Sequence, residues 1–240
     1  MTLSRRLVAE CVGSALLLAA VVGSGIMGER LAGGNVALVL LANTLATGAV
    51  LVCIILALGP ISGAHLNPAV TLCDASQGGV SWGDAGSYIV AQFIGAVAGV
   101  ATADAMFGEP IFALSQHARH GPGQLLSEFM ATFGLLAVIW GCSRQRSSTV
   151  VAFAVGAYIT AAYWFTASTS FANPAVTFAR SLTDTFAGIR PVDVPGFVVA
   201  QFGGAAAATA LFRWLVPTLP ATAPRVVARD LNRVGGARRP

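Results

Sequence analysis

The sequence predicts an all-α membrane protein in which six transmembrane helices and two re-entrant half-helices form an inverted repeat. Three observations support this prediction. The 240-residue chain is 55% hydrophobic and only 10% charged, whereas soluble domains carry about 25% charged residues. Six apolar stretches are long enough to cross a bilayer, and the pentapeptide NPAVT occurs twice, at 67–71 and at 173–177.

The six apolar stretches account for most of the chain. A membrane-spanning helix needs about 20 mostly apolar residues. The ranges that meet this requirement are 6–27, 36–58, 82–107, 124–142, 149–166 and 194–216. The first range resembles a secretory signal peptide, but Glu10 interrupts its apolar run and the range has a counterpart later in the chain. We therefore expect it to be retained as a helix.

The arginines predict how the chain is oriented in the membrane. All 14 basic residues are arginine, a bias typical of GC-rich bacterial genes. With the N-terminus in the cytoplasm, ten arginines lie inside or near that face and four lie outside, as the positive-inside rule requires. The sequence thus predicts a multi-pass protein of the plasma (inner) membrane with both termini cytoplasmic. Residues 218–240 form an Arg-rich cytoplasmic tail in this prediction, with no role in nucleic-acid binding.

Two shorter segments, 67–76 and 173–182, do not fit the pattern of full spans. Each is about ten residues long, and ten helical residues reach only about 15 Å, half of a bilayer. Both begin with Asn-Pro. An asparagine side chain accepts free N–H groups at a helix start, and proline in the first turn lacks the donor that would be left unpaired. We expect each NPAVT to open a half-helix.

The two halves of the chain match each other. VAECVGSALLLAAV around Glu10 corresponds to LSEFMATFGLLAVI around Glu128, and VAQFIGAVAGVATA corresponds to VAQFGGAAAATALF. The predicted boundaries are 1–115 for the first repeat and 116–217 for the second. Because each repeat holds three full spans, the second enters the membrane from the opposite side. The two half-helices then meet near the midplane, N-terminus to N-terminus.

The segment SGAHLNPA at 62–69, together with the second Asn-Pro-Ala at 173–175, resembles the major intrinsic protein family of aquaporins and aquaglyceroporins. The resemblance covers nearly the whole chain. It implies a homotetramer in which every protomer has its own pore, with no cofactor and no enzymatic activity. It also implies that Asn67 and Asn173 donate hydrogen bonds to a passing molecule at the pore centre. Partial positive charge at the half-helix N-termini disfavours cations there.

One position departs from the family's pattern. The residue after the second Asn-Pro-Ala is usually an arginine of the narrow outer filter, but here it is Val176. Carrying the other filter positions over by spacing gives Thr47 and Ser170. For the fifth span the gapless match gives Ala161, whereas a match anchored on a nearby glycine gives Tyr163 instead. We expect the filter to contain Ala161, so that its side chains are small, mildly polar and uncharged.

Such a filter leaves a wide aperture. Selectivity then depends mainly on size and on the cost of stripping charged solutes of water. We therefore expect a passive channel for small uncharged solutes, among them glycerol, urea and metalloid hydroxides such as arsenous acid (arsenite), alongside water. An orthodox water-selective channel is the alternative. An enzyme is not expected, because the sequence has no nucleophile motif and no cluster of metal ligands.

Glu10 and Glu128 are the acidic residues deep in the predicted spans that have a partner in the other repeat. We expect each of them to anchor the re-entrant loop beside it by accepting hydrogen bonds. The alternative is a relay in which the two carboxylates carry protons, since acidic residues inside a membrane often do so. In that case the protein would be a proton-coupled transporter.

Two vestibule residues are predicted at opposite mouths of the pore. His65 lies two residues before Asn67, on the cytoplasmic approach, and lacks the companions that a metal site requires. Arg180 lies four residues after Val176, on the same helical face and one turn nearer the outside. Asp184 follows at i+4, where it can pair with Arg180. We expect a salt bridge there that holds the following loop.

Overall fold

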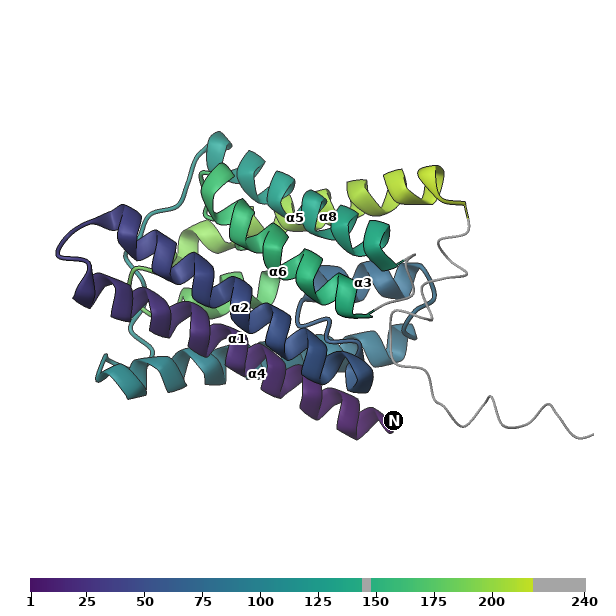
Figure 1. Cartoon of the computed structure of the whole chain (residues 1–240), viewed down its shortest axis with the longest axis horizontal. Helices are drawn as coiled ribbons and strands as arrows, with labels where there is room; N and C mark the ends of the chain where they lie inside the picture. The colour runs from purple at the N-terminus through teal and green to yellow at the C-terminus, as the bar shows by residue number, and fades with distance from the viewer. Residues whose placement is uncertain (144–147, 218–240) are drawn as a thin grey trace, which may run out of the picture.

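A computed structural model describes residues 1–143 and 148–217 of the chain. The described residues form eight α-helices and one short 3-10 helix (Figure 1). The elements are α1 (Leu3–Leu31), α2 (Val36–Ser62), α3 (Pro68–Ser76), α4 (Trp82–Phe107), α5 (Pro122–Ser143), α6 (Ser148–Phe165), α7 (Pro174–Arg180), η1 (Pro191–Asp193) and α8 (Val194–Leu215). The predicted tail at 218–240 lies outside the described residues.

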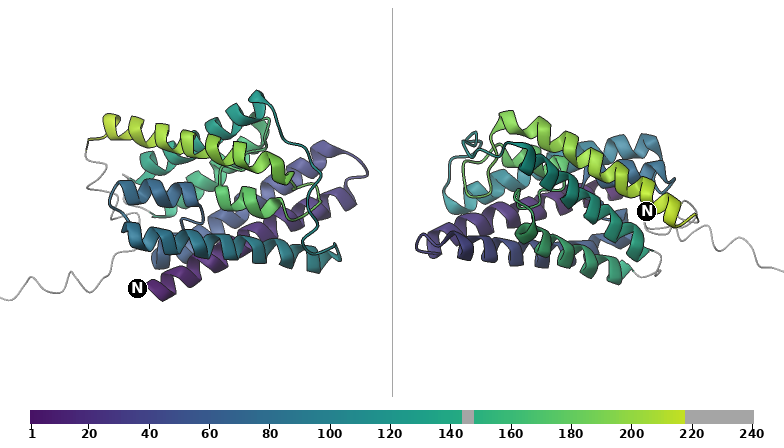
Figure 2. Two further views of the ribbon diagram at one scale, coloured as in Figure 1. Left: turned by 180° about the vertical axis from the view of Figure 1, so that it is seen from behind. Right: turned by 90° about the horizontal axis from the view of Figure 1, so that it is seen from above.

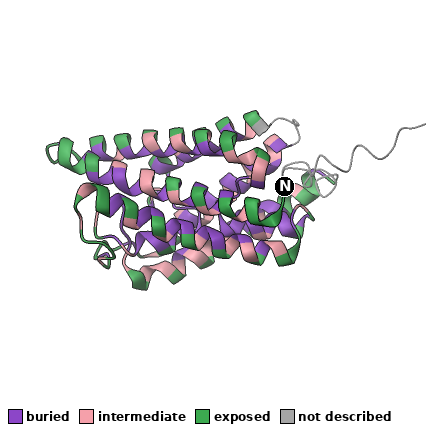
Figure 3. Ribbon diagram, turned by 90° about the horizontal axis from the view of Figure 1, so that it is seen from below, coloured by how far each residue is buried: buried purple, intermediate pink, exposed green. Residues whose placement is uncertain are grey.

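Six long helices correspond to the six predicted spans and confirm the predicted fold class. Within the described residues, α1, α2, α4, α5 and the combined η1–α8 segment are long and apolar enough to cross a membrane. The described apolar part of α6, Thr149–Phe165, is slightly shorter. Exposed apolar side chains such as Val8, Val90 and Val199 lie on the long helices. Figure 3 shows buried residues gathered between the helices and exposed ones along their outward faces.

The two half-helices are present, and each is opened by its Asn-Pro pair. The Oδ1 atom of Asn67 accepts the backbone N–H of Ala69 at 2.9 Å. The Oδ1 atom of Asn173 accepts the backbone N–H of Ala175 at 3.0 Å. In both cases the proline that follows occupies the first helical turn, where a missing N–H costs no hydrogen bond. Capping therefore fixes where both half-helices start.

The second half-helix is shorter than predicted, because α7 ends at Arg180 rather than at residue 182. The carbonyl of Ser181 accepts the backbone N–H of Ser115. In a continuing helix, the Ser181 carbonyl would accept the N–H of the residue four positions later. Here it accepts an N–H from the segment before α5 instead.

The helices pair in the same way in the two halves. α1 packs along α4, and α5 packs along α8 (Figures 1 and 2). Equivalent glycines bring the backbones close: a Cβ on Gly95 would lie 2.0 Å from the carbonyl oxygen of Cys11, and one on Gly204 would lie 2.2 Å from that of Phe129. α3 contacts α8 and α7 contacts α4, so the half-helices tie the halves together. The repeat boundary at 115/116 stays a prediction.

We expect Gly95→Val to destabilise the protein, because the new side chain would overlap the backbone of Cys11 and overpacking costs about 1–3 kcal/mol or more. The thermal unfolding temperature of the purified protein in detergent should fall by several degrees. Gly86→Ala is the matched control in the same helix, since a Cβ there meets no atom within 4 Å. An unchanged unfolding temperature for Gly95→Val would contradict the close helix contact.

Candidate functional site

A cavity lies among the helices and both half-helices. Part of its lining is apolar and comes from α1, α2, α5 and α6; these side chains include Leu17, Val21, Leu51, Ile55, Leu135, Ile139, Val151, Val155 and Ile159. The rest comes mainly from the half-helices and from the loops that precede them, at 63–66 and 170–172. The cavity thus combines apolar side chains of the long helices with residues of two irregular loops.

The two loops in this lining share an unusual backbone conformation. Ala64 and Leu66 have φ angles of 47° and 52°, and Ser170 and Ala172 have φ angles of 52° and 51°. Such left-handed conformations are unfavourable for residues with a side chain and cost about 1–3 kcal/mol each. The surrounding structure must therefore hold both loops in place.

Glu10 holds the first loop. Its carboxylate accepts hydrogen bonds from four donors: the Ser62 hydroxyl at 2.6 Å, the backbone N–H groups of His65 and Leu66 at 2.9 and 2.7 Å, and Nε2 of Gln92 at 2.8 Å. Four donors match the four acceptor positions of an ionised carboxylate. Glu10 is fully buried and does not belong to the cavity lining.

Glu128 holds the second loop in the same manner. Its carboxylate accepts the backbone N–H groups of Phe171 and Ala172, both at 2.9 Å. It also accepts a hydrogen bond from Nε2 of Gln201 at 2.6 Å. Glu128 is fully buried as well and lies outside the cavity lining. Both carboxylates are thus engaged by the loops rather than by the pore.

Gln92 and Gln201 complete this scaffold, although neither was among the predicted site residues. The Nε2 atom of Gln92 also donates to Oγ1 of Thr71 at 2.9 Å, and that of Gln201 donates to Oγ1 of Thr177 at 2.7 Å. Each threonine hydroxyl in turn donates to the carbonyl of the asparagine that opens its half-helix, at 3.0 and 2.8 Å. The recurrence of VAQF in both repeats is the sequence signal for this role.

Asn67 and Asn173 meet at the centre, where each binds the loop of the other half. The Nδ2 atom of Asn67 donates to the carbonyl of Ala172 at 2.8 Å. The Nδ2 atom of Asn173 donates to the carbonyl of Leu66 at 2.7 Å. Both side chains line the cavity. Because Nδ2 carries two hydrogens, each asparagine keeps one N–H for a molecule in the cavity.

Three of the residues predicted for the filter, Thr47, Ser170 and Val176, line the cavity. Ala161 does not: it is exposed on α6, and the structure contradicts it as a lining residue. Tyr163 lines the cavity instead, and its hydroxyl oxygen lies 3.3 Å from Oγ1 of Thr47. Two residues along a helix differ by about 200° in direction, so positions 161 and 163 lie on opposite faces.

Arg180 also lines the cavity and is buried. Its guanidinium carbon lies 3.4 Å from the ring centroid of Phe171, and its Nε donates to the carbonyl of Ala187. The described residues contain no ion pair between Arg180 and Asp184, so the expected salt bridge is wrong. Asp184 instead accepts the backbone N–H of Gln116 at 2.8 Å. The helical i+4 spacing does not apply, because α7 already ends at Arg180.

A second buried cation, Arg119, was not predicted. Its guanidinium carbon lies 5.0 Å from the same ring of Phe171, and it donates to three backbone carbonyls at 2.8 to 3.3 Å. Burial lowers the pKa of Arg119 to about 10, which leaves the guanidinium charged at neutral pH. Phe171 is therefore flanked by two positive charges at this end of the cavity.

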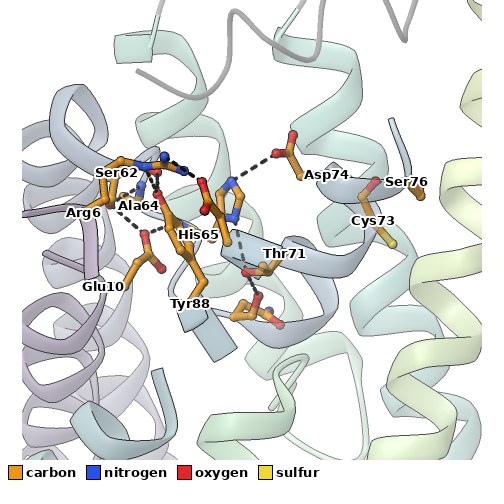
Figure 4. Close-up of polar contacts among 12 residues, drawn as sticks. Arg6, Glu10, Ser62, Ala64, His65, Thr71, Cys73, Asp74, Ser76 and Tyr88 are labelled. Carbon is orange, nitrogen blue, oxygen red and sulfur yellow. Dashed lines mark hydrogen bonds and ion pairs between the residues drawn. The ribbon is translucent and has the colours of Figure 1, made fainter. Parts of the chain in front are cut away.

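His65 and Asp74 meet at the opposite end of the cavity, beside the first turns of α1 (Figure 4). Nε2 of His65 lies 3.6 Å from a carboxylate oxygen of Asp74, and Nδ1 of His65 lies 3.2 Å from Oγ1 of Thr71. Arg6 reaches the same region and donates to the hydroxyl of Tyr88 at 2.7 Å. Among the residues that line the cavity, Asp74 is thus the acidic one at this end, whereas Arg180 is basic.

We expect Glu10→Gln to destabilise the protein by about 1–3 kcal/mol, because an amide accepts fewer hydrogen bonds than a carboxylate and leaves buried loop donors unpaired. Thermal unfolding in detergent measures this loss. Glu109→Gln is the control, since Glu109 forms a partly exposed ion pair with Arg30, and such pairs contribute about 0–1 kcal/mol. Full stability of Glu10→Gln with loss of any proton-driven uptake would instead favour a proton relay.

The chain is similar to known proteins over most of its length. The family model described as Major intrinsic protein matches residues 1–166 and 124–236. Aquaglyceroporin AqpS of Rhizobium meliloti (strain 1021) is 54% identical over 230 residues, which cover 92% of this chain and 98% of that protein. Probable aquaporin AqpM of Archaeoglobus fulgidus is 33% identical over 244 residues, which cover 90% of this chain and 98% of that protein.

A solved structure has the same fold. The X-ray structure of the aquaglyceroporin from Plasmodium falciparum matches with a TM-score of 0.73 and 19% sequence identity, over 92% of this chain and 100% of that chain. The family match, the close relative and the paired Asn-Pro-Ala half-helices agree with one another. The chain belongs to the major intrinsic protein family.

Proposed function

We propose that the chain is a passive channel whose filter admits glycerol, urea and neutral metalloid hydroxides such as arsenous and boric acid, alongside water. The observation that carries this proposal is the filter itself. Val176 occupies the position where the family usually has arginine, so the ring of Thr47, Tyr163, Ser170 and Val176 holds no guanidinium. The name of the relative AqpS, an aquaglyceroporin, agrees with this proposal.

The chemistry of the cavity suits a solute that has an apolar and a polar side. The carbon atoms of a polyol can contact apolar side chains such as Leu51, Ile139 and Ile159. Its hydroxyl groups can accept the N–H groups that Asn67 and Asn173 keep free. An ion would lose its hydration in this cavity without comparable compensation. Uncharged solutes are therefore favoured.

Positive charge at two levels excludes cations and protons in this proposal. The N-termini of α3 and α7 each carry about half an elementary charge at the pore centre. Arg180 adds a full charge at the filter end of the cavity. It thereby supplies, one helical turn farther along α7, the cation that Val176 does not provide. The filter can therefore lack an arginine at position 176 and still repel cations.

A water-selective channel is the second candidate. It is favoured by the 3.3 Å contact between the hydroxyl groups of Tyr163 and Thr47, which narrows the ring. A proton-coupled transporter has less support, because Glu10 and Glu128 accept hydrogen bonds from the loops and lie outside the cavity lining. Passive passage through a fixed path is the better account of this arrangement.

We further propose that the protein is a homotetramer in the inner membrane of a bacterium, with one pore in each protomer and both termini in the cytoplasm. The relative AqpS comes from a bacterium, and the excess of arginine near the termini supports the orientation. Exposed apolar side chains on the long helices suit contact with lipid or with neighbouring protomers.

We expect Val176→Arg to reduce glycerol and arsenous acid permeability by about tenfold or more, the effect of about 1.4 kcal/mol in the barrier, while water permeability changes less than about threefold. The new guanidinium narrows the ring and orders water but obstructs larger solutes. Stopped-flow light scattering of proteoliposomes measures the three permeabilities. Val192→Arg is the control, because Val192 is exposed on η1.

Two outcomes would contradict this assignment of the filter. If the wild-type protein passes only water, the contact between Tyr163 and Thr47 closes the ring and the water-selective reading holds. If the wild-type protein passes glycerol and Val176→Arg still passes it equally well, selectivity is determined elsewhere in the cavity.

We expect Arg180→Gln to raise proton leakage by about tenfold, because one buried charge near the path contributes more than about 1.4 kcal/mol to the barrier against cations. Arg180→Lys should keep the barrier. Proteoliposomes that hold a pH-sensitive dye report the leak, and glycerol flux in the same vesicles shows whether the pore is intact. Equal leakage in the glutamine and lysine variants would show that the half-helices exclude protons without Arg180.

A further inference from the structure

Two buried polar groups at the His65 end of the cavity lack hydrogen-bond partners. The side chains of His65 and Asp74 are only 3% and 2% exposed, and both line the cavity. Nε2 of His65 and both carboxylate oxygens of Asp74 have no hydrogen-bond partner among the described residues. The 3.6 Å between Nε2 and Oδ2 exceeds the usual hydrogen-bond range of about 2.7–3.2 Å. A buried polar group without a partner is costly, so such groups indicate a place for a ligand.

The hydrogen bonds of Thr71 determine which nitrogen of His65 carries the proton. The Thr71 hydroxyl has one hydrogen, which it donates to the carbonyl of Asn67 at 3.0 Å, and it accepts Nε2 of Gln92 at 2.9 Å. Nδ1 of His65, at 3.2 Å from the same oxygen, must then be the donor. In a neutral imidazole this leaves Nε2 as an acceptor. With His65 neutral and Asp74 ionised, two acceptors therefore face each other with no donor between them.

Both acceptors are held in position. A Cβ on Gly79 would lie 2.2 Å from both carboxylate oxygens of Asp74, so this carboxylate takes its place only because residue 79 has no side chain. His65 is fixed through its backbone N–H, which donates to Glu10 at 2.9 Å, and its ring lies 5.5 Å from that of Tyr88. Figure 4 shows the imidazole and the carboxylate directed toward each other.

Arg6 does not supply the missing donor. Its Nε donates to the hydroxyl of Tyr88 at 2.7 Å, and its Nη1 forms an ion pair with Asp84 at 3.1 Å. No hydrogen bond from Arg6 to Asp74 is present in the described part of the chain. A donor to Nε2 or Oδ2 must therefore come from a molecule in the cavity.

We propose that His65 and Asp74 form a binding site for neutral solutes in which two hydroxyl or amino groups are attached to the same atom or to neighbouring atoms. Vicinal diols, metalloid hydroxides and the amide groups of urea belong to this class. One donor binds Nε2 and the other binds Oδ2, whereas a mono-alcohol satisfies only one acceptor. This inference rests on the proposed channel function, because the solute reaches the site through the cavity. It adds selection by donor number to selection by size.

The test compares ethylene glycol with ethanol, two small solutes that differ in one hydroxyl group. The full-length protein, labelled with ¹⁵N-histidine and held in lipid nanodiscs, contains three histidines; His117→Gln and His120→Gln assign the resonances. The Nε2 resonance of His65 should start in the acceptor form and shift on titration. Ethylene glycol should reach half-saturation at about tenfold lower concentration than ethanol, the effect expected of one more hydrogen bond to a charged acceptor.

Two variants keep the test independent of folding. Asp74→Leu should abolish the preference for ethylene glycol, and Gly79→Ala should reduce it by displacing the carboxylate without altering a lining residue. Gly86→Ala is the matched control and should bind both solutes as the wild type does, because a Cβ there meets nothing within 4 Å. Equal half-saturation for the two solutes in the wild-type protein would overturn the proposal.

A second result would also overturn it. If Nε2 of His65 has the resonance of an imidazolium at neutral pH without solute, a proton shared with Asp74 occupies the position. Glycerol flux into proteoliposomes separates this inference from the proposed function. If glycerol passes through the protein but the His65 resonance does not respond to solute, only the proposed binding site is refuted. If the resonance responds but glycerol does not pass, only the proposed channel for larger solutes is refuted.

Discussion

Both re-entrant loops are buried between the helices, and a buried carboxylate on a neighbouring full-length helix supplies hydrogen-bond partners for each of them. Irregular backbone persists in a membrane only where protein or water satisfies its polar groups. Glu10 and Glu128 each accept two backbone N–H groups of a loop, which stabilises its left-handed residues. The half-helices are thereby directed toward the centre, where Asn67 and Asn173 line the cavity. The position of the polar pore groups thus depends on two side chains that lie outside the cavity lining.

The two halves share this scaffold but differ where they face the solute. Seven residues after each central asparagine stand Asp74 in the first half and Arg180 in the second. These residues end up at opposite mouths of the cavity, since the half-helices run in opposite directions from the centre. The repeat therefore provides a symmetric frame with equivalent caps, anchors and helix contacts. Chemical differences between its ends arise from a few substitutions that leave the frame intact.

Features that follow from local patterns could be predicted from the sequence. The spans follow from apolar runs, and the half-helices follow from caps that join residues two positions apart. Spacing alone allowed two alignments of the fifth span with the family, and these differ by two residues. One alignment puts Ala161 in the filter and the other puts Tyr163 there. Because two residues along a helix point to opposite faces, only the structure shows which of them lines the cavity. The expected pair of Arg180 with Asp184 assumed a helix that had already ended. Arg119 had no local signal, since its carbonyl partners lie 49 or more positions away.

The reciprocal asparagine bonds at the centre join the two halves of the chain into one body. A transporter that works by alternating access rocks one repeat against the other around a central site. Here Asn67 binds Ala172 and Asn173 binds Leu66, so a rocking motion would break both bonds in every cycle. These two bonds therefore disfavour a cycle of this kind. In the proposed passive channel, a solute crosses along a fixed path, and diffusion and the contacts that it meets set its rate.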